Sequence, residues 1–504
     1  MPRRGDLTSV LVIGPGREAG SGRAGAAACR VLRAEGLRVA VVVGGSASTM
    51  ADPDLADATY VEPVTPETVE EVIARERPDA LLPAFGGRTA FDTAVALHGS
   101  GVLARYGVEL IGVELIGADL DAARPDDGSG RGRREVELAL VCDRHGAAMV
   151  VGSVEHFGPV SVAPAMTLTG ADERWMCEVA SAVVRGAAAG GRVVRFAVEP
   201  RTSRPVVVGV AARVSRSGVL AAGAAGFPIA EVVTRLALGY PLDEVAPVAP
   251  VAPVGDRVVV EASGAVGVGR SFPEALNKAL RSSPGGPLSW AEPVGDVAAL
   301  VQAARVAGGR VDVVHRAVRA GADIAELAAA TGLDPWLLGR VRRVEEVARE
   351  VAAQVGALRP ETVVLAKEHG LSDAQIGQLR HLTEDEVREL RRALGLLPHR
   401  PVPSGTAPRV VVLGPDAGSD DTCALAEAGY EVVVVDPGPE AVPAGHRAYR
   451  EPITVETVLD VVAAEGAARV LVSGRAPLGL AARLRAAGVS VLGVGPGAVA
   501  GSFP

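Results

Sequence analysis

The feature that most constrains the fold is an internal repeat. The stretch YVEPVTPETV at residues 60–69 returns almost letter for letter as YREPITVETV at 449–458. Around each stretch, apolar strand-like runs alternate with Gly-rich turns and Ala-rich helices in the same order, which predicts right-handed βαβ units and a parallel sheet. Strands are expected at 10–13, 39–43, 80–83 and 109–112, and again at 410–413, 431–435, 470–473 and 490–493. Each copy is therefore predicted to be a small doubly wound α/β domain.

The region between the copies changes character twice. Strand-like runs at 192–198 and 205–210 mix with helical runs at 171–185 and 229–238, which is an α+β pattern. A linker rich in Pro and Val follows at 245–254 and favours an extended spacer. From 297 to 397 helical periods dominate, and Asp334, Ser372 and Thr383 are expected to cap helices. The predicted domains are therefore 1–120, 121–245, 246–296, 297–400 and 401–504.

Composition narrows the class of protein. A chain of 504 residues is too long for one apolar core, and with 48% apolar but only 3% aromatic residues its cores must be built from small aliphatic side chains. A net charge of -9 argues against nucleic acid as a partner. The four cysteines, Cys29, Cys142, Cys177 and Cys423, lie far apart and suit reduced thiols in a cytoplasm. No apolar run is long enough to span a membrane, and the start of the chain carries no export signal.

Several motifs resemble the large subunit of carbamoyl-phosphate synthase. Residues 51–63, 76–83 and 86–90 resemble that family's first pre-ATP-grasp domain. Residues 162–168, 213–217 and 225–230 are similar to the C-terminal half of its first ATP-grasp domain, and 336–338, 370–373 and 390–392 to its oligomerisation domain. The resemblance implies an α/β multidomain protein with two small doubly wound pre-ATP-grasp domains, a truncated α+β ATP-grasp remnant and an all-helical oligomerisation domain.

The resemblance does not extend to every part of the family protein. The resemblance implies that the second ATP-grasp domain and the C-terminal regulatory domain are absent. Where the family has a lid subdomain, the chain has the polar stretch 119–133, which is expected to be a loop. A Gly-rich segment that contacts the nucleoside in the family is also absent between Phe157 and Val162.

The family's magnesium ligands are replaced. By resemblance, an acidic residue, an asparagine and a glutamine of the family correspond to Gly209, Ala211 and Arg195. Mg²⁺ requires hard oxygen donors, so neither Gly209 nor Ala211 can ligate it, and a cation at Arg195 repels it. No catalytic, nucleotide-binding or metal-binding residue is therefore assigned, and ATP and Mg²⁺ are implied by the resemblance alone.

A few charged residues of the family's site are retained. Arg213 and Arg216 correspond to arginines that face the reacting phosphate in the family, which makes them candidate anion ligands; a solvated or salt-bridged pair is the alternative. Glu137 aligns with the strand after the lid, but Glu135 and Glu137 alternate with apolar residues as on an ordinary half-exposed strand. The turn at 14–16, which opens a helix, is a weak signal for phosphate binding, since such turns also need glycine for the fold alone. The eight histidines suggest no alternative catalytic site.

Two functions from different classes follow from these residues. The preferred hypothesis is a non-catalytic binding, scaffold or regulatory module that associates with itself, a glutaminase subunit or a full-length synthase. The alternative is an ATP-dependent carbamoyl-phosphate synthase, of the pathways to pyrimidines and arginine, that completes its site with a partner chain. A relic with no role beyond folding is a third reading that the sequence leaves open.

Overall fold

The chain forms two compact units, which are described separately. The computed structural model describes residues 5–15, 22–45, 49–51, 55–113, 134–198, 205–246, 257–283, 285–291, 293–396, 407–414, 420–438, 447–472, 477 and 479–494. Unit 1 comprises Met1–Glu155 and Ala163–Gly255, and unit 2 comprises His156–Val162 and Asp256–Pro504.

Unit 1 begins with a five-stranded parallel sheet in the order β3-β2-β1-β4-β5. Its strands are β1 (Ser9–Ile13), β2 (Arg38–Val43), β3 (Ala58–Val61), β4 (Ala80–Leu82) and β5 (Glu109–Leu110). The helical segments between them are α1 (Gly22–Ala34), η1 (Thr49–Ala51), α2 (Pro66–Glu76), α3 (Gly87–Gly99) and α4 (Val102–Tyr106). Val and Leu fill β1, β2 and β4 on both faces, as expected for a parallel sheet with helices on each side.

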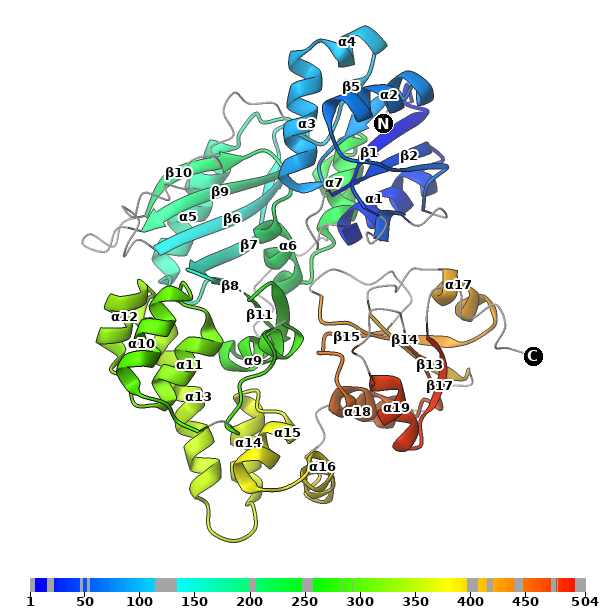
Figure 1. Ribbon diagram of the computed structural model, residues 1–504. Coiled ribbons are helices and arrows are strands. Elements are labelled where there is room, and N and C mark those ends of the chain that lie inside the picture. The colour runs from blue at the N-terminus through cyan, green and yellow to red at the C-terminus, as the bar shows by residue number, and fades with distance from the viewer. Residues whose placement is uncertain are drawn as a thin grey trace. The chain divides into compact units, whose positions relative to one another are not determined.

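The rest of unit 1 is an antiparallel sheet with helices (Figure 1). Its strands, in the order β10-β9-β6-β7, are β6 (Arg134–Cys142), β7 (Ala148–Phe157), β9 (Gly190–Val198) and β10 (Pro205–Ala211). The helices are α5 (Gly170–Val183), α6 (Arg216–Ala225), α7 (Ile229–Ala237) and α8 (Leu242–Val245). Apolar side chains of α5 pack on β6 and β9. α7 contacts α1 of the first α/β domain, so the two parts of unit 1 share a packed boundary.

Unit 2 starts with a small sheet, β8 (Val160–Ala163), β11 (Val258–Ala262) and β12 (Ala265–Gly269), covered by α9 (Phe272–Ser282). α9 lies so close to β12 that a Cβ atom at Gly267 would come within 2.2 Å of the Ala275 carbonyl oxygen. Glycine at 267 is therefore required by this packing.

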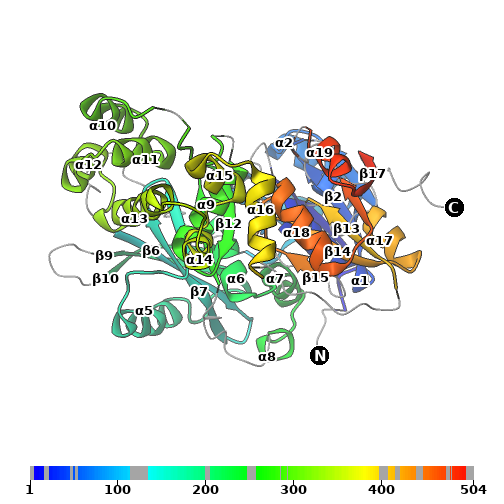
Figure 2. The ribbon, with the colours of Figure 1, turned by 90° about the horizontal axis from the view of Figure 1, so that it is seen from below.

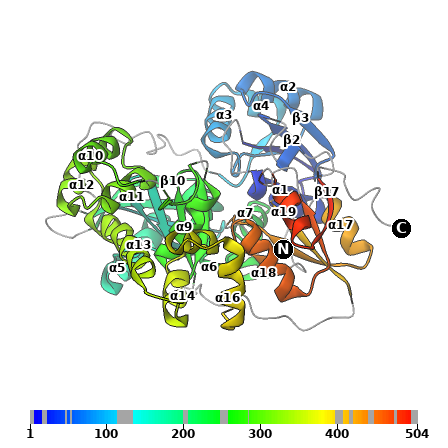
Figure 3. The ribbon, with the colours of Figure 1, turned by 60° about the horizontal axis from the view of Figure 1, so that its bottom comes forward.

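A helical domain follows in unit 2 (Figure 3). It comprises α10 (Val297–Val306), α11 (Val311–Arg319), α12 (Ile324–Thr331), α13 (Pro335–Ala353), α14 (Pro360–Glu368), α15 (Asp373–Arg380) and α16 (Glu384–Ala393). The predicted caps Asp334, Ser372 and Thr383 are confirmed, since each side chain accepts a hydrogen bond from a backbone N–H in the first turn. In the core that joins this domain to the small sheet, the Trp336 ring stacks on Phe157 and meets Phe272 edge-on.

The second α/β domain confirms the repeat. Its parallel sheet has the order β15-β14-β13-β16-β17, which is the order of the first sheet. The strands are β13 (Arg409–Leu413), β14 (Glu431–Val435), β15 (Arg447–Tyr449), β16 (Arg469–Val472) and β17 (Ser490–Val494), and the helices are α17 (Asp420–Glu427), α18 (Val455–Glu465) and α19 (Leu480–Ala486). Even side-chain contacts recur, since Tyr60 donates to Glu76 and Tyr449 donates to Glu465.

Two sequence interpretations need correction. β3 and β15 are strands that run into the two copies of the repeated stretch, and neither was predicted as a strand. β6 is not half-exposed, because residues 136–142 are all buried, Glu137 included. The predicted loop at 119–133 and the positions Gly16 and Pro415 lie outside the described residues, as does most of the linker at 245–254.

The remaining sequence expectations concern cysteines and membranes. Cys29, Cys142 and Cys177 are free thiols, and burial raises the pKa of the Cys29 thiol to about 12, so it stays neutral. The side chain of Cys423 lies outside the described part. Within the described ranges no single helix is long and apolar enough to cross a membrane; α6 and α7 meet that requirement only as a pair, with a bend of 116° between them.

Candidate functional site

Three neighbouring strands of unit 1 align the residues that are predicted, from the family resemblance, to stand in place of metal ligands. In the β9–β10 register Gly209 lies opposite Arg195, and in the β6–β9 register Arg195 lies opposite Glu137. The row therefore runs Gly209, Arg195, Glu137 across β10, β9 and β6. Ala211 lies two residues further along β10, opposite Val193, and is buried.

Arg195 and Glu137 form an ion pair at the centre of this row. The Arg195 Nε donates to Glu137 Oε1 at 2.9 Å, and the two side chains are only 17% and 8% exposed. Such a charge-assisted bond, largely shielded from water, ties the carboxylate to a guanidinium of the same sheet. The negative charge of Glu137 is therefore already neutralised by the protein.

The residues of this row do not fit a magnesium ion. Mg²⁺ needs several hard oxygen ligands in near-octahedral geometry, and Gly209 and Ala211 supply no side-chain oxygen. The one carboxylate of the row is held by Arg195. Among the described residues no group of three or more His, Cys, Asp or Glu side chains could hold a metal ion.

The two arginines predicted to bind an anion occupy different environments. Arg213 follows β10 and is buried, whereas Arg216 is the first residue of α6 and is exposed. Ser215 caps α6 by accepting a hydrogen bond from the Gly218 N–H at 3.0 Å. Arg213 thus lies in the connection between β10 and α6, and Arg216 lies at the start of α6. Binding of one anion by both arginines stays a prediction.

Sequence reasoning missed a buried carboxylate beside this site. Glu155 on β7 has no exposed surface, and its Oε2 accepts from the Met166 and Thr167 N–H groups at 2.9 and 3.0 Å. Arg134 lies 3.9 Å from its other oxygen. These contacts fix the strand-to-helix connection ahead of α5, which is a structural role.

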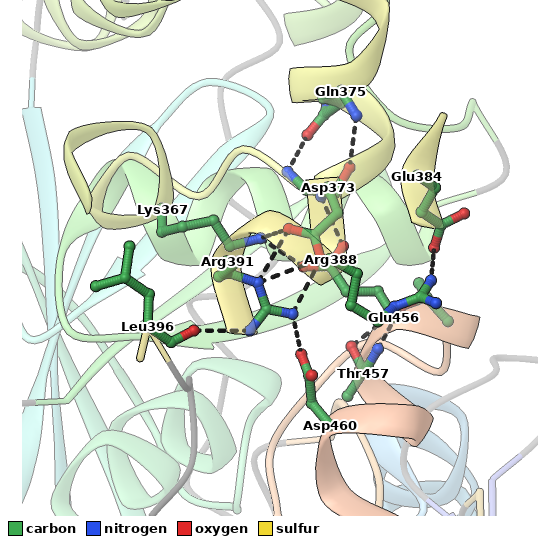
Figure 4. Close-up of polar contacts among 12 residues, drawn as sticks. Lys367, Asp373, Gln375, Glu384, Arg388, Arg391, Leu396, Glu456, Thr457 and Asp460 are labelled. Carbon is green, nitrogen blue, oxygen red and sulfur yellow. Dashed lines mark hydrogen bonds and ion pairs between the residues drawn. The ribbon is translucent and has the colours of Figure 1, made fainter. Parts of the chain in front are cut away.

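A larger charged network lies in unit 2 between the helical domain and the second α/β domain (Figure 4). Arg391 of α16 is only 1% exposed and donates from Nη2 to Asp373 at 2.9 Å and to Asp460 at 2.6 Å. Its Nη1 donates to the Leu396 carbonyl oxygen at 3.0 Å. Asp460 lies on α18, so this guanidinium joins the two domains (Figure 2).

A second contact of the network runs from α14 and α15 to α18. Lys367 donates to Asp373 at 2.9 Å and also to Glu456, whose other oxygen accepts from the Asp373 N–H at 2.9 Å. Burial alone would raise the pKa of Glu456, but Lys367 and Arg281 outweigh it and hold this pKa at about 2. Burial raises the pKa of Asp460, against the opposing effect of Arg391. Glu456 is therefore strongly stabilised as a carboxylate.

No single motif signalled this network. Asp373 was recognised only as part of the capped stretch 370–373, and Arg391 as part of 390–392, both matched to the oligomerisation domain. An aspartate at the first position of a helix is usually solvated, but Asp373 is fully buried. The one available signal was a pair of acidic residues, Glu456 and Asp460, spaced one turn apart on a largely apolar helix that repeats an earlier one.

Arg195→Ala is expected to destabilise unit 1 by about 1–3 kcal/mol, because Glu137 would keep a buried charge without its guanidinium. Hydrogen exchange of the full chain in denaturant, read on β6, β9 and the helix α5 that carries Trp175, measures this loss in unit 1. Arg174→Ala, an exposed change on the same helix as Trp175, should stay within about 0.5 kcal/mol. Equal stability of the Arg195→Ala and wild-type chains would show that the ion pair contributes nothing.

Comparison with known proteins agrees with this architecture. Three models of carbamoyl-phosphate synthase large-chain domains match: the preATP-grasp domain at 6–119 and 416–500, the ATP-binding domain at 129–245, and the oligomerisation domain at 264–395. The preATP-grasp model matches both copies of the repeat. The helices α10–α16 fall within the oligomerisation match, as predicted.

Relatives show the same family over nearly the whole chain. The carbamoyl phosphate synthase large chain of Kineococcus radiotolerans is 38% identical over 667 positions, which cover 99% of this chain and 60% of the relative. That of Streptomyces griseus is 37% identical over 673 positions, with 99% and 61% covered. The chain thus spans about three fifths of the length of these curated relatives.

Solved structures add little. A biotin carboxylase from Campylobacter jejuni covers 51% of this chain and 76% of its own with 13% identity and a TM-score of 0.39, a likeness too weak to support an argument. The assignment rests on the three domain models, the long alignments and the repeated α/β sheets. The chain therefore belongs to the family of carbamoyl-phosphate synthase large chains.

Proposed function

We propose that this chain is a non-catalytic member of its family that acts as a binding and assembly module. The observation that carries the proposal is the Arg195–Glu137 ion pair at 2.9 Å, at the position that the family resemblance assigns to the metal. A guanidinium there repels a divalent cation and occupies the remaining carboxylate. Without such a cation, the charge of a triphosphate is not neutralised during phosphoryl transfer.

Internal deletions support the same proposal. The alignments to relatives run over 667 and 673 positions, which is longer than the whole chain of 504 residues. The relatives therefore contain internal segments that have no counterpart here. The preATP-grasp and ATP-binding matches are separated by only residues 120–128, close to where the sequence comparison predicts the loss of the lid subdomain.

In contrast to the metal site, the helical domain that we propose to serve in assembly is present. The helical domain has capped helices and an apolar core, and the oligomerisation model matches residues 264–395. We propose that the partner is a second copy, a glutaminase subunit or a full-length synthase, in the cytoplasm. Selection for protein–protein contacts, and not for catalysis, would preserve the fold and allow the metal ligands to be lost.

We expect calorimetry to detect no Mg²⁺-dependent binding of ATP to the wild-type chain at nucleotide concentrations of about 1 mM. The matched control is Arg195→Gln/Gly209→Glu/Ala211→Asn, which restores the family's residue types and should regain heat on Mg²⁺ addition. Tight binding of Mg-ATP by the wild type, or ATP turnover with bicarbonate and ammonia that is lost in Arg213→Ala, would favour the catalytic alternative.

A further inference from the structure

The second α/β domain uses one acidic face to bind α9 and two helices of the helical domain. Glu451, which precedes α18, pairs with Lys278 of α9 at 2.7 Å. Glu456 and Asp460 on α18 pair with Lys367 of α14 and Arg391 of α16. Three carboxylates along one edge of this domain thus meet three cations that project from three helices. Figures 2 and 3 show that α16 and α18 lie side by side.

The internal repeat places the same face on the first α/β domain. The repeated stretch aligns Glu451 with Glu62 and Glu456 with Glu67, and one helical turn later Asp460 aligns with Glu71. The local structure is also the same, because Thr65 and Thr454 each cap their helix by accepting from the N–H three residues on. Glu62, Glu67 and Glu71 therefore have the geometry of a face that binds cationic helices in the other copy.

In the first copy this face has no partner among the described residues. Glu62, Glu67 and Glu71 are all exposed, and none of them forms an ion pair there. Neighbouring acidic residues of α2 are paired, since Glu70 contacts Arg105 and Glu76 contacts Arg38. The lack of partners is thus specific to the three positions whose counterparts bind the helical domain.

We propose that Glu62, Glu67 and Glu71 form a docking surface for a partner protein whose helices present Lys and Arg side chains. Charge complementarity argues for this class of partner, because the equivalent carboxylates are matched by Lys278, Lys367 and Arg391. A lone metal ion is a poor occupant, since no described carboxylate cluster could hold one. Val61, 45% exposed beside Glu62, adds an apolar contact that can be desolvated on docking.

This surface rests on the proposed role as an assembly module, but it is tested separately. Nucleotide calorimetry decides whether the chain is catalytic and says nothing about α2. Conversely, if Glu62, Glu67 and Glu71 bind no partner, the Arg195–Glu137 ion pair still opposes metal binding.

The test uses carbodiimide, a zero-length reagent that joins carboxylates to lysine amines in contact. The full chain is treated with it in extract of the cells that make it, and linked residues are mapped by mass spectrometry. We expect Glu62, Glu67 or Glu71 to be linked to lysines on helices of one partner. With that partner purified, Glu67→Gln/Glu71→Gln should raise Kd about tenfold or more, and added salt should weaken binding.

The matched control is Glu173→Gln/Glu178→Gln on α5, which removes two exposed charges from another helix of unit 1. This variant should bind the partner with unchanged Kd, and circular dichroism should show both double variants folded. Cross-links confined to the chain itself, or a Kd that Glu67→Gln/Glu71→Gln leaves unchanged, would identify α2 as an ordinary solvated helix face and overturn the proposal.

Discussion

Arg391→Ala is expected to destabilise unit 2 by about 3–5 kcal/mol, because it strands the buried carboxylates of Asp373 and Asp460 without their shared cation. Removing one member of a buried ion network lowers the free energy of unfolding by more than the intact network adds to it, because the remaining charges stay buried without their partner. Urea denaturation of the full chain, followed by tryptophan fluorescence, measures the loss, because Trp336 on α13 and Trp290 beside the helical core both report on unit 2. Hydrogen exchange should show faster exchange in both α16 and α18.

Arg392→Ala is the matched control. Arg392 is the next residue of α16, is 42% exposed and lies 3.8 Å from Asp460. An ion pair of this exposure contributes about 1 kcal/mol or less, so the control should lose little stability. If Arg391→Ala and Arg392→Ala cost the same, or if α18 keeps its exchange protection in Arg391→Ala, the network does not join the two domains.

Local features of the fold followed from the sequence because their causes are local. The caps at Asp334, Ser372 and Thr383 depend on a side chain and a backbone N–H two or three residues away. Because the two α/β domains are repeats, the same strand order was expected in both, and both have it. β3 and β15 were missed because short strands of three or four residues at a sheet edge carry little apolar pattern.

The charged contacts could not be predicted because they join distant positions. Arg391 and Asp460 are 69 residues apart, and their contact depends on how α16 packs against α18. The Arg195–Glu137 pair depends on the β6–β9 register, in which a slip of one residue would turn Glu137 to the opposite face. The resemblance predicted that Arg195 stands where the family has a metal-facing glutamine, but only the register revealed the carboxylate that Arg195 neutralises.

The stability of unit 2 is expected to fall in acid through Glu456. The folded pKa of this carboxylate, about 2, lies below its ordinary value of 4.5, so its contribution is full above pH 4.5 and is lost as pH falls toward 2. A shift of this size corresponds to about 3 kcal/mol by linkage. Asp460 acts in the opposite direction, since its raised pKa makes its contribution greatest at low pH.

The stability difference between wild type and Glu456→Gln isolates the first effect, because Asp460 is present in both chains. Urea denaturation from pH 7 downward should show this difference constant to about pH 4.5 and shrinking below it. Glu67→Gln changes the equivalent position of the first copy, which is exposed, so its difference from wild type should stay within about 0.5 kcal/mol at every pH. A Glu456→Gln difference that is independent of pH, or that grows in acid, would show that Lys367 and Arg281 do not hold Glu456 ionised. The ionic contact of α18 with the helical domain would then rest on the Arg391–Asp460 pair.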